Sequence, residues 1–303
     1  MSEPPLDCLV IGAGPAGLTA AIYLARFRRR FFVAESGSSR ASGIPLSHNL
    51  AGFPDGVRGA ELLERMTAQA TRFGATIQRC EVTSVEPCSE GFRVTLSGRS
   101  LRTKTILMAT GTIDIEPPLP GIADAVRRRL IRHCGICDGF EAINQKIGVI
   151  GRGPTGMGEA LFMRAYSPHI SLLSLGRPCD LSSDERRCLS DAGINVIEET
   201  ISEVITQGDR IIALTDRSGV QHAFDTLYSA LGSIVRSELA TELGAALDER
   251  NCVLVDAHQQ SSVKGLFAAG DVASGLDQIG VAIGHAAIAA TAIHNQLGAA
   301  KAI

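Results

Sequence analysis

Cys8–Glu35 reads CLVIGAGPAGLTAAIYLARFRRRFFVAE, and Gly148–Ser174 reads GVIGRGPTGMGEALFMRAYSPHISLLS. Each stretch predicts a short apolar strand, a glycine-rich turn, an amphipathic helix and a second apolar strand. This order is the βαβ unit of a dinucleotide-binding domain. Two copies in register, 139 residues apart, are stronger evidence than one glycine turn. The sequence therefore predicts an α/β protein with two Rossmann-like three-layer domains.

The first glycine turn has the full pattern of a dinucleotide site. Gly12 permits the tight turn, Gly14 lets a pyrophosphate approach the backbone, and Gly17 lets the helix pack on the strand. Free N–H groups at the helix start then face the phosphates. Glu35 follows Gly17 by 18 residues, where a carboxylate can accept hydrogen bonds from a ribose. We expect this turn to bind a dinucleotide.

The second glycine turn keeps Gly151, Gly153 and Gly156 but lacks the groups that select a nicotinamide cofactor. Ser174 stands where the first copy has its carboxylate, and Arg177 is the only nearby cation for the 2′-phosphate of NADPH. Two interpretations stay open: a functional nicotinamide site, or a domain that keeps the fold and binds the cofactor poorly.

Composition limits the class of protein. The chain has 303 residues, 45% of them hydrophobic, and a net charge of −3, which suits two globular domains and gives no general attraction to nucleic acid or anionic membranes. The N-terminus has no signal-peptide pattern, and the apolar run 279–293 is too short to span a bilayer. We expect a cytoplasmic protein with no membrane and no nucleic-acid partner.

One cysteine pair, Cys134 and Cys137, has the spacing C-x-x-C. Zinc needs two further ligands, and His133 is too close in sequence to Cys134 to chelate the same ion well, so we expect no metal. Redox chemistry needs an attacking and a resolving sulfur, which this spacing supplies. Asp138 follows the pair and is placed to carry a proton or to stabilise a helix start. The remaining cysteines are interpreted as core or incidental thiols: Cys8, Cys80, Cys88, Cys179, Cys188 and Cys252.

These motifs together resemble the low-molecular-weight thioredoxin reductase family, in order and over nearly the whole chain. The matching stretches are VIGAGPAGLTAAIYLAR (10–26), LAGFPDGVRGAELLERMTAQATRFGA (50–75), ILMATG (106–111), CGICDG (134–139) and VKGLFAAGDV (263–272).

The resemblance implies an FAD domain, residues 1–114 and 236–303, interrupted by an NADPH-binding-like domain, residues 115–235, that carries the dithiol. It also implies a homodimer. The FAD contacts that it implies are Gly12, Gly14, Pro15, Ala16, Gly17, Glu35, Thr110, Gly111, Gly270, Asp271, Gln278 and Ile279.

The resemblance also assigns chemical roles. Cys137 would accept electrons from reduced FAD, Cys134 would exchange with the disulfide of thioredoxin or another dithiol protein, and Asp138 would act as the acid–base. Domain rotation would present the dithiol to each side in turn.

Two departures from the family pattern bear on the electron donor. The arginine-rich cluster that grips the NADPH 2′-phosphate is reduced to Arg177, and the Gly-Gly-Gln segment near the flavin is replaced by SRASGIP, residues 39–45. We therefore favour weak or no NADPH use and another donor such as ferredoxin. The alternatives are a conventional NADPH-dependent thioredoxin reductase and, third, a flavin thiol oxidase acting on a small dithiol.

Three further features are less specific. The basic run Arg127–Arg129 with Arg132 predicts either a solvated face or a docking site for an acidic partner. A second basic run, Arg26–Arg30, follows a predicted helix and suits its C-terminal dipole. His285 is expected to be a polar residue with its hydrogen bonds satisfied.

Overall fold

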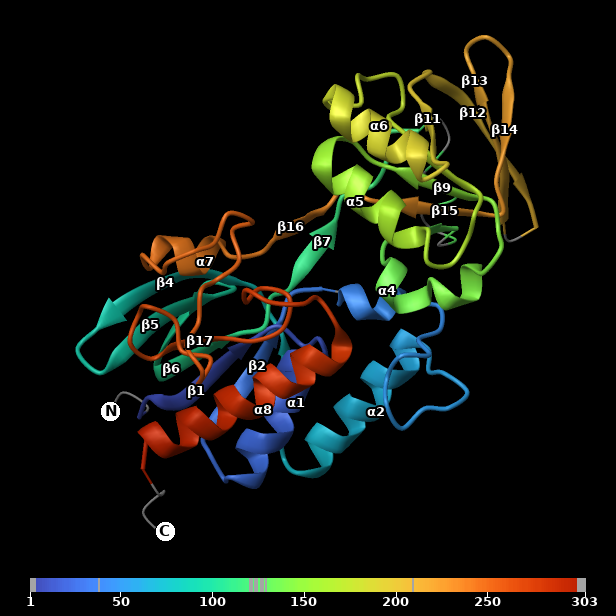
Figure 1. The fold of residues 1–303 in the computed structure, drawn as a ribbon. Helices are drawn as coiled ribbons and strands as arrows, with labels where there is room; N and C mark the ends of the chain where they lie inside the picture. Colours follow the sequence, from blue (N-terminus) through green and yellow to red (C-terminus); the bar gives the residue numbers. More distant parts are fainter. Residues whose placement is uncertain are drawn as a thin grey trace. The chain divides into compact units, whose positions relative to one another are not determined.

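The computed structural model describes residues 4–37, 39–119, 122, 125, 128, 130–208 and 210–298. The chain forms two compact units. Unit 1 combines Met1–Leu46, Leu50–Ile113 and Val235–Ile303, and unit 2 combines Ser47–Asn49 and Asp114–Ile234. Figure 1 shows the blue and the red ends of the chain in the same unit. Unit 1 is therefore discontinuous in sequence.

Unit 1 is built on a seven-stranded mixed sheet in the order β3-β2-β1-β6-β5-β4, with β17 paired to β6. Strands β1, β2, β3, β6 and β17 run parallel, whereas β4 and β5 are antiparallel additions to one end of β6. The strands are β1 (Leu6–Ile11), β2 (Phe31–Glu35), β3 (Ile77–Arg79), β4 (Val82–Cys88), β5 (Gly91–Leu96), β6 (Arg99–Met108) and β17 (Leu266–Ala268).

Both faces of the parallel strands in unit 1 are buried, which is why they read as continuous apolar runs. Val10 faces a core that includes the alanines of α1 and α8, and Leu9 faces a second core with Val94 and Ile106. Helix α8 is apolar nearly all round because it packs against α1 and β17. The helices are α1 (Pro15–Arg26), η1 (Arg40–Gly43), α2 (Gly59–Arg72), α7 (Glu238–Glu242) and α8 (Ile279–Gln296).

Unit 2 contains a five-stranded parallel sheet, β11-β10-β9-β15-β8, and a three-stranded antiparallel sheet, β12-β13-β14. Its strands are β8 (Ile131–Arg132), β9 (Ile147–Ile150), β10 (Ile170–Leu173), β11 (Asn195–Ile197), β12 (Ile201–Gln207), β13 (Arg210–Asp216), β14 (Gln221–Ala223) and β15 (Thr226–Ser229). Its helices are α4 (Gly135–Asp138), η2 (Phe140–Ala142), α5 (Gly153–Met163) and α6 (Ser183–Asp191).

The chain passes between the units in two short strands. These are β7 (Thr112–Asp114) and β16 (Ser233–Val235), and they pair with each other. Backbone hydrogen bonds from Ile115 N–H to the Gly232 carbonyl and from Arg236 N–H to the Gly111 carbonyl flank this pair, both 3.0 Å long. The outgoing and returning chain therefore run side by side at the crossing.

The predicted fold class is confirmed. Both βαβ repeats form, as β1-α1-β2 in unit 1 and β9-α5-β10 in unit 2, each with parallel strands. Among the residues that the structure describes, no helix has the length and apolarity to cross a membrane.

Candidate active site

The first glycine turn is closed so tightly that only glycine fits at two of its positions. Gly12 has φ +110°, and a Cβ there would lie 2.2 Å from the carbonyl oxygen of Ala109. A Cβ on Gly17 would lie 1.8 Å from the carbonyl oxygen of Gly12. Real side chains do not tolerate such approaches, so β1, the turn and α1 pack backbone to backbone.

The start of α1 is open to a ligand. Gly14 is the N-cap, no side chain caps the helix, and Pro15 occupies the first helical position. A Cβ on Gly14 would lie 3.0 Å from the Ser39 Oγ and would meet no backbone atom. Glycine here is therefore not needed to avoid a backbone clash, and it leaves space beside the start of the helix. The uncapped N–H groups of the first turn, including that of buried Ala16, favour a bound anion. Glu35 ends β2. These groups fit the pyrophosphate and ribose of FAD.

The other predicted FAD residues lie at the carboxyl ends of the same parallel strands. Thr110 and Gly111 follow β6, and Thr110 Oγ1 donates to the Arg236 carbonyl at 2.7 Å. Gly270 follows β17, and its φ is +76°. A Cβ on Gly270 would lie 3.1 Å from the Ala16 Cβ, which places this turn against α1. The carboxyl edge of a parallel sheet is where nucleotides bind in such folds.

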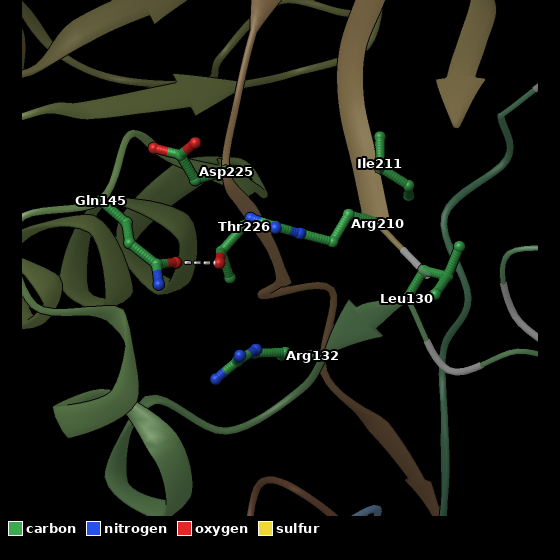
Figure 2. Close-up of a pocket in the computed structure, with 7 residues that line it drawn as sticks. All are labelled: Leu130, Arg132, Gln145, Arg210, Ile211, Asp225 and Thr226. Atoms are coloured by element: carbon green, nitrogen blue, oxygen red, sulfur yellow. Dashed lines mark hydrogen bonds between the residues drawn. The ribbon is translucent and has the colours of Figure 1, made fainter. Parts of the chain in front are cut away.

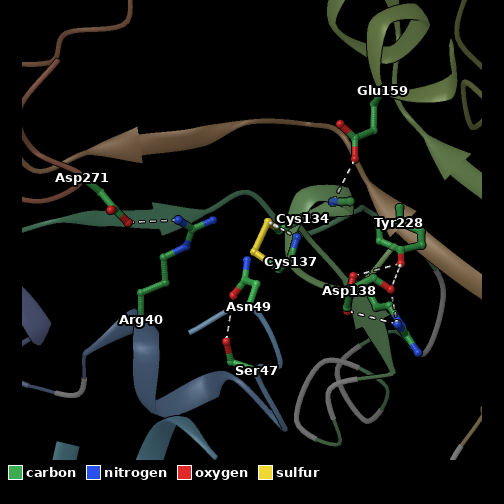
Figure 3. The surroundings of a disulfide bond; sticks show 11 residues. Arg40, Ser47, Asn49, Cys134, Cys137, Asp138, Glu159, Tyr228 and Asp271 are labelled. Atoms are coloured by element: carbon green, nitrogen blue, oxygen red, sulfur yellow. Dashed lines mark hydrogen bonds and ion pairs between the residues drawn. A yellow bond between two sulfur atoms is a disulfide. The ribbon is translucent and has the colours of Figure 1, made fainter. Parts of the chain in front are cut away.

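Asp271 and the start of α8 complete this set. The Asp271 carboxylate is paired with Arg40 at 3.0 Å (Figure 3). Arg40 begins η1, inside the segment that departs from the family pattern, so this departure places a cation at the predicted flavin site. Gln278 is the N-cap of α8 and Ile279 its first residue.

The expectation for His285 was wrong. Its Nδ1 is buried and has no hydrogen-bond partner among the described residues. The neighbouring positions Gly284 and Ala286 offer no polar side chain, and the ring lies against Gly275, whose Cβ would be 3.4 Å from Cε1. Burial lowers the pKa of the imidazole, and the charge of Asp271 opposes this shift. Among the described residues, the small apolar side chains of α8 next to His285 therefore leave its Nδ1 without a hydrogen-bond partner.

The second glycine turn is also tightly packed. A Cβ on Gly151 would lie 2.8 Å from the Gly156 Cα, and Gly153 has φ +56°. However, the Gly153 N–H at the start of α5 donates to the Cys179 carbonyl at 2.8 Å. Arg152, also in the turn, pairs with Asp180 at 3.1 Å. The segment Cys179–Asp180 thus brings a carbonyl and a carboxylate to the place where a pyrophosphate would need donors.

The region after β10 offers few cations. Ser174 Oγ donates to the Arg177 carbonyl at 2.5 Å, which closes a tight turn. Within the described residues Arg177 has no ion-pair partner, whereas Arg186 pairs with Glu198 at 2.8 Å and Arg187 pairs with Asp184 at 2.8 Å. Among the arginines of this region, Arg177 is therefore the one without an ion-pair partner in the described structure.

Cys134 and Cys137 form a disulfide around the start of the short helix α4 (Figure 3). Cys134 is the N-cap, and its Sγ accepts a hydrogen bond from the Cys137 N–H at 3.1 Å. Both cysteines are half-buried. An N–H aimed at a sulfur favours its thiolate form, so after reduction Cys134 is the better nucleophile.

Polar side chains from unit 2 contact α4, the short helix that begins at the disulfide. The Asp138 carboxylate accepts from the Tyr228 hydroxyl at 2.9 Å and pairs with Arg132 at 3.1 Å. Glu159, on α5, accepts from the Gly135 N–H at 3.2 Å. Burial raises the pKa of both carboxyl groups, Asp138 and Glu159. Among the described residues, no cluster of three or more histidine, cysteine or acidic side chains is placed to bind a metal.

No pattern in the sequence selects Tyr228, Glu159 or the Cys179–Asp180 segment. Tyr228 lies in the short strand β15, where an aromatic residue suggests core packing, and it is fully buried. Only the tertiary fold brings its hydroxyl to Asp138.

The basic run near the dithiol is only partly described. Arg127 and Arg129 lie outside the described residues. Arg128 donates to the carbonyl of Gly208, and Arg132 pairs with Asp138. The two arginines that the structure describes therefore make contacts within unit 2.

A cavity of about 140 Å³ in unit 2 shares Arg132 with the surroundings of the dithiol. Figure 2 shows Arg132 and Arg210 on either side of the space, with the hydrogen-bonded pair Thr226 and Gln145 between them. Its lining residues are Leu130, Arg132, Gln145, Arg210, Ile211, Asp225 and Thr226.

Comparisons with known proteins agree over most of the chain. The family model for pyridine nucleotide-disulphide oxidoreductases matches residues 6–286. The thioredoxin reductase of Streptomyces coelicolor is 33% identical over 280 residues, which cover 88% of this chain and 85% of that protein. The solved structure of HlmI has a TM-score of 0.89 at 31% identity and covers 98% of this chain and 94% of its own. The thioredoxin reductase structure from Streptococcus pyogenes has the same fold, with a TM-score of 0.88 at 24% identity over 98% and 99% of the two chains.

Proposed function

The chain belongs to the pyridine nucleotide-disulphide oxidoreductase family, among relatives of thioredoxin reductase, and on this premise we propose that it is an FAD-dependent disulfide reductase with a degenerate nicotinamide site. Electrons pass through Cys134 and Cys137 to the disulfide of thioredoxin or another dithiol protein. The observation that carries this function is the Cys134–Cys137 disulfide, with Asp138 next to Cys137 in the same short helix.

The first glycine turn supplies the flavin site. When bound and reduced, the flavin would donate the two electrons that reduce the Cys134–Cys137 disulfide. Gly14 and the start of α1 hold its pyrophosphate, Glu35 its ribose, and Asp271 the region between the pyrophosphate and the flavin ring. His285, whose ring nitrogen lacks a protein partner, is available for a polar ligand atom in the same unit.

Thiol–disulfide exchange with the partner runs in two balanced steps. The Cys134 thiolate attacks one partner sulfur, a mixed disulfide forms, and the expelled partner thiolate takes a proton from the Asp138 carboxyl. Cys137 then gives its proton to the Asp138 carboxylate and attacks the Cys134 sulfur. The Cys134–Cys137 disulfide reforms, and Asp138 protonates the second partner thiolate. Two electrons and two protons leave the enzyme, and the partner becomes a dithiol.

The nicotinamide site is the part in which this chain departs from its family. The start of α1 is uncapped, whereas the Gly153 N–H at the start of α5 is already bonded to the Cys179 carbonyl. Asp180 adds a negative charge at that turn. Arg177 is the only cation without an ion-pair partner in the described part of the 174–187 region. Each lost charge-assisted phosphate contact weakens binding by about 1.5–3 kcal/mol. These contacts support weak or no NADPH use and another donor, such as ferredoxin.

Anaerobic reduction of the bound flavin tests the donor. The FAD-loaded enzyme is titrated with NADPH, then with reduced ferredoxin or dithionite, and the visible flavin band is followed. We expect no rapid bleaching at micromolar NADPH and complete bleaching with dithionite. Rapid bleaching at micromolar NADPH would show a conventional NADPH-dependent reductase instead.

A second measurement tests whether electrons pass through the dithiol, independently of the natural electron donor. The dithionite-reduced enzyme is freed of excess reductant and mixed with oxidised thioredoxin, and new thioredoxin thiols are counted. Cys134→Ser should remove this transfer. Full transfer in that variant would show that the dithiol is not on the path of electrons.

A further inference from the structure

Asp138 is held by side chains from two neighbouring strands of unit 2. Arg132 ends β8 and Tyr228 lies in β15, and the two residues stand opposite each other in the register of this parallel pair. The Arg132 Cζ lies 5.9 Å from the centre of the Tyr228 ring. Strand pairing therefore fixes the two side chains as neighbours before either reaches Asp138.

Each oxygen of the Asp138 carboxylate has its own donor. The Tyr228 hydroxyl lies 2.9 Å from Oδ1, and the Arg132 Nη1 lies 3.1 Å from Oδ2. The same two groups also reach the Asp138 main-chain carbonyl, at 3.1 Å and 3.2 Å. Figure 3 shows the contacts between Tyr228 and Asp138. The carboxyl group therefore cannot rotate without breaking two hydrogen bonds.

We propose that Arg132 and Tyr228 are positioning residues that hold the Asp138 carboxyl in one orientation and set the pH at which it releases its proton. The proposal rests on the proposed function of Asp138 as the acid–base of thiol–disulfide exchange. Both residues contact Asp138 and act on the exchange through it.

The charges around Asp138 give the direction of the effect. Burial raises the pKa of its carboxyl, and the negative charge of Glu141, in η2, acts the same way. Glu159, on α5, is a second carboxylate whose charge is coupled to Asp138. Arg132 and Tyr228 lower the pKa because a cation and a hydroxyl donor stabilise the carboxylate. Removing either one raises it.

Two disulfide probes isolate the proton-transfer step. Bis(2-hydroxyethyl) disulfide expels a basic alkyl thiolate that needs a proton, whereas 4,4′-dithiodipyridine expels a stabilised aromatic thiolate. The FAD-loaded enzyme is reduced with dithiothreitol, freed of reductant under argon and mixed with either probe. Quenching with a maleimide and mass spectrometry of the dithiol peptide give both rates. We take the rate with bis(2-hydroxyethyl) disulfide divided by the rate with 4,4′-dithiodipyridine. Ionisation of the attacking Cys134 thiol affects both rates equally, so this ratio reports the protonation of the acid alone.

In the wild-type enzyme this ratio falls as pH rises through the pKa of Asp138. Arg132→Gln should move the midpoint upward by roughly 1 pH unit and Tyr228→Phe by a smaller amount, because an opposite charge shifts a pKa more than a single neutral donor does. Arg132→Lys, which keeps the charge, should recover part of the shift. Tyr166→Phe is the matched control: its ring packs on Gly139, and its hydroxyl is not bonded to Asp138.

Asp138→Asn distinguishes the role of Asp138 as the acid from the positioning role of Arg132 and Tyr228. If its ratio keeps the wild-type pH dependence, Asp138 is not the acid and both the proposed step and this inference fail. If Asp138→Asn abolishes the pH dependence while Arg132→Gln and Tyr228→Phe leave the wild-type midpoint in place with full flavin content, only the positioning role is overturned.

Discussion

Gly17 lies in the first turn of α1 with the Gly12 carbonyl directly over its Cα. The space that any side chain would need is filled by backbone of β1 and the turn, which cannot move without opening the flavin site. The requirement for glycine here is steric, because the absence of a Cβ allows a helix and a strand to approach closely.

Gly17→Ala should therefore cost stability and flavin together. A Cβ at 1.8 Å from a carbonyl oxygen forces the helix away from the strand, and overpacking of this kind costs roughly 3 kcal/mol. We expect a protein that purifies with little FAD and unfolds at lower denaturant. Flavin absorbance and urea unfolding measure the two effects.

Gly158→Ala is the matched control for this change. Gly158 is exposed in α5, and a Cβ there would meet no atom within 4 Å. Alanine should raise stability by about 0.5–1 kcal/mol through its helix propensity. Equal flavin loss in both variants would contradict the steric argument for Gly17.

The sequence predicted residues whose role is local and missed those whose role depends on the fold. Gly12 and Cys134 are recognised from neighbours a few positions away, because a turn and a C-x-x-C loop are local structures. Tyr228 is 90 residues from Asp138, and a buried tyrosine in a strand has the same sequence signature whether it binds a carboxylate or only fills a core. The missing hydrogen bond of His285 is invisible for the same reason.

Among helices, strands and the contacts between them, local features were again predictable from the sequence and tertiary contacts were not. The βαβ repeats were predictable because an apolar strand, a glycine turn and a periodic helix follow one another directly. The contact between Cys179 and the Gly153 N–H was not, since no pattern shows where the chain after β10 turns back. The basic run Arg26–Arg30 was interpreted as charge at the end of its own helix, yet Arg29 serves a different helix.

Arg29 caps the C-terminus of α8 from across unit 1. Its side chain is buried, its Nε donates to the His294 Nδ1 at 3.0 Å, and Nη2 donates to the His294 carbonyl at 2.6 Å and to the Gly298 carbonyl. The last carbonyls of a helix have no partner within it, and a cation there also suits the dipole.

Arg29→Ala should destabilise the protein by about 2–3 kcal/mol, since it removes charge-assisted bonds and leaves the two carbonyls at the end of α8 without these donors. Urea unfolding at neutral pH measures this loss. Arg28→Ala is the control: Arg28 is exposed nearby, and its replacement should change stability by less than about 0.5 kcal/mol. Equal losses in the two variants would show that net charge matters rather than the cap.

At the scale of the whole molecule, unit 1 depends on both ends of the chain. β17 pairs with β6 inside the main sheet, and α8 packs against α1, so the last segment completes both cores. Unit 2 is inserted where β7 and β16 run side by side, and the Arg236 N–H reaches the Gly111 carbonyl at 3.0 Å. The ends that an excision would join are therefore already adjacent.

This arrangement predicts that unit 1 binds FAD by itself while neither of its pieces does. Replacing residues 114–234 with a short Gly-Ser linker should leave a protein with a visible flavin spectrum and cooperative unfolding, because both cores and the carboxyl edge of the sheet are retained. Ending the chain at residue 234 should abolish flavin binding, since β17 and α8 are lost. Gly17→Ala in the linked variant is the control for specific binding. A linked variant that folds without binding flavin would show that unit 2 contributes to the flavin site, and one that fails to fold would show that the insertion stabilises the sheet.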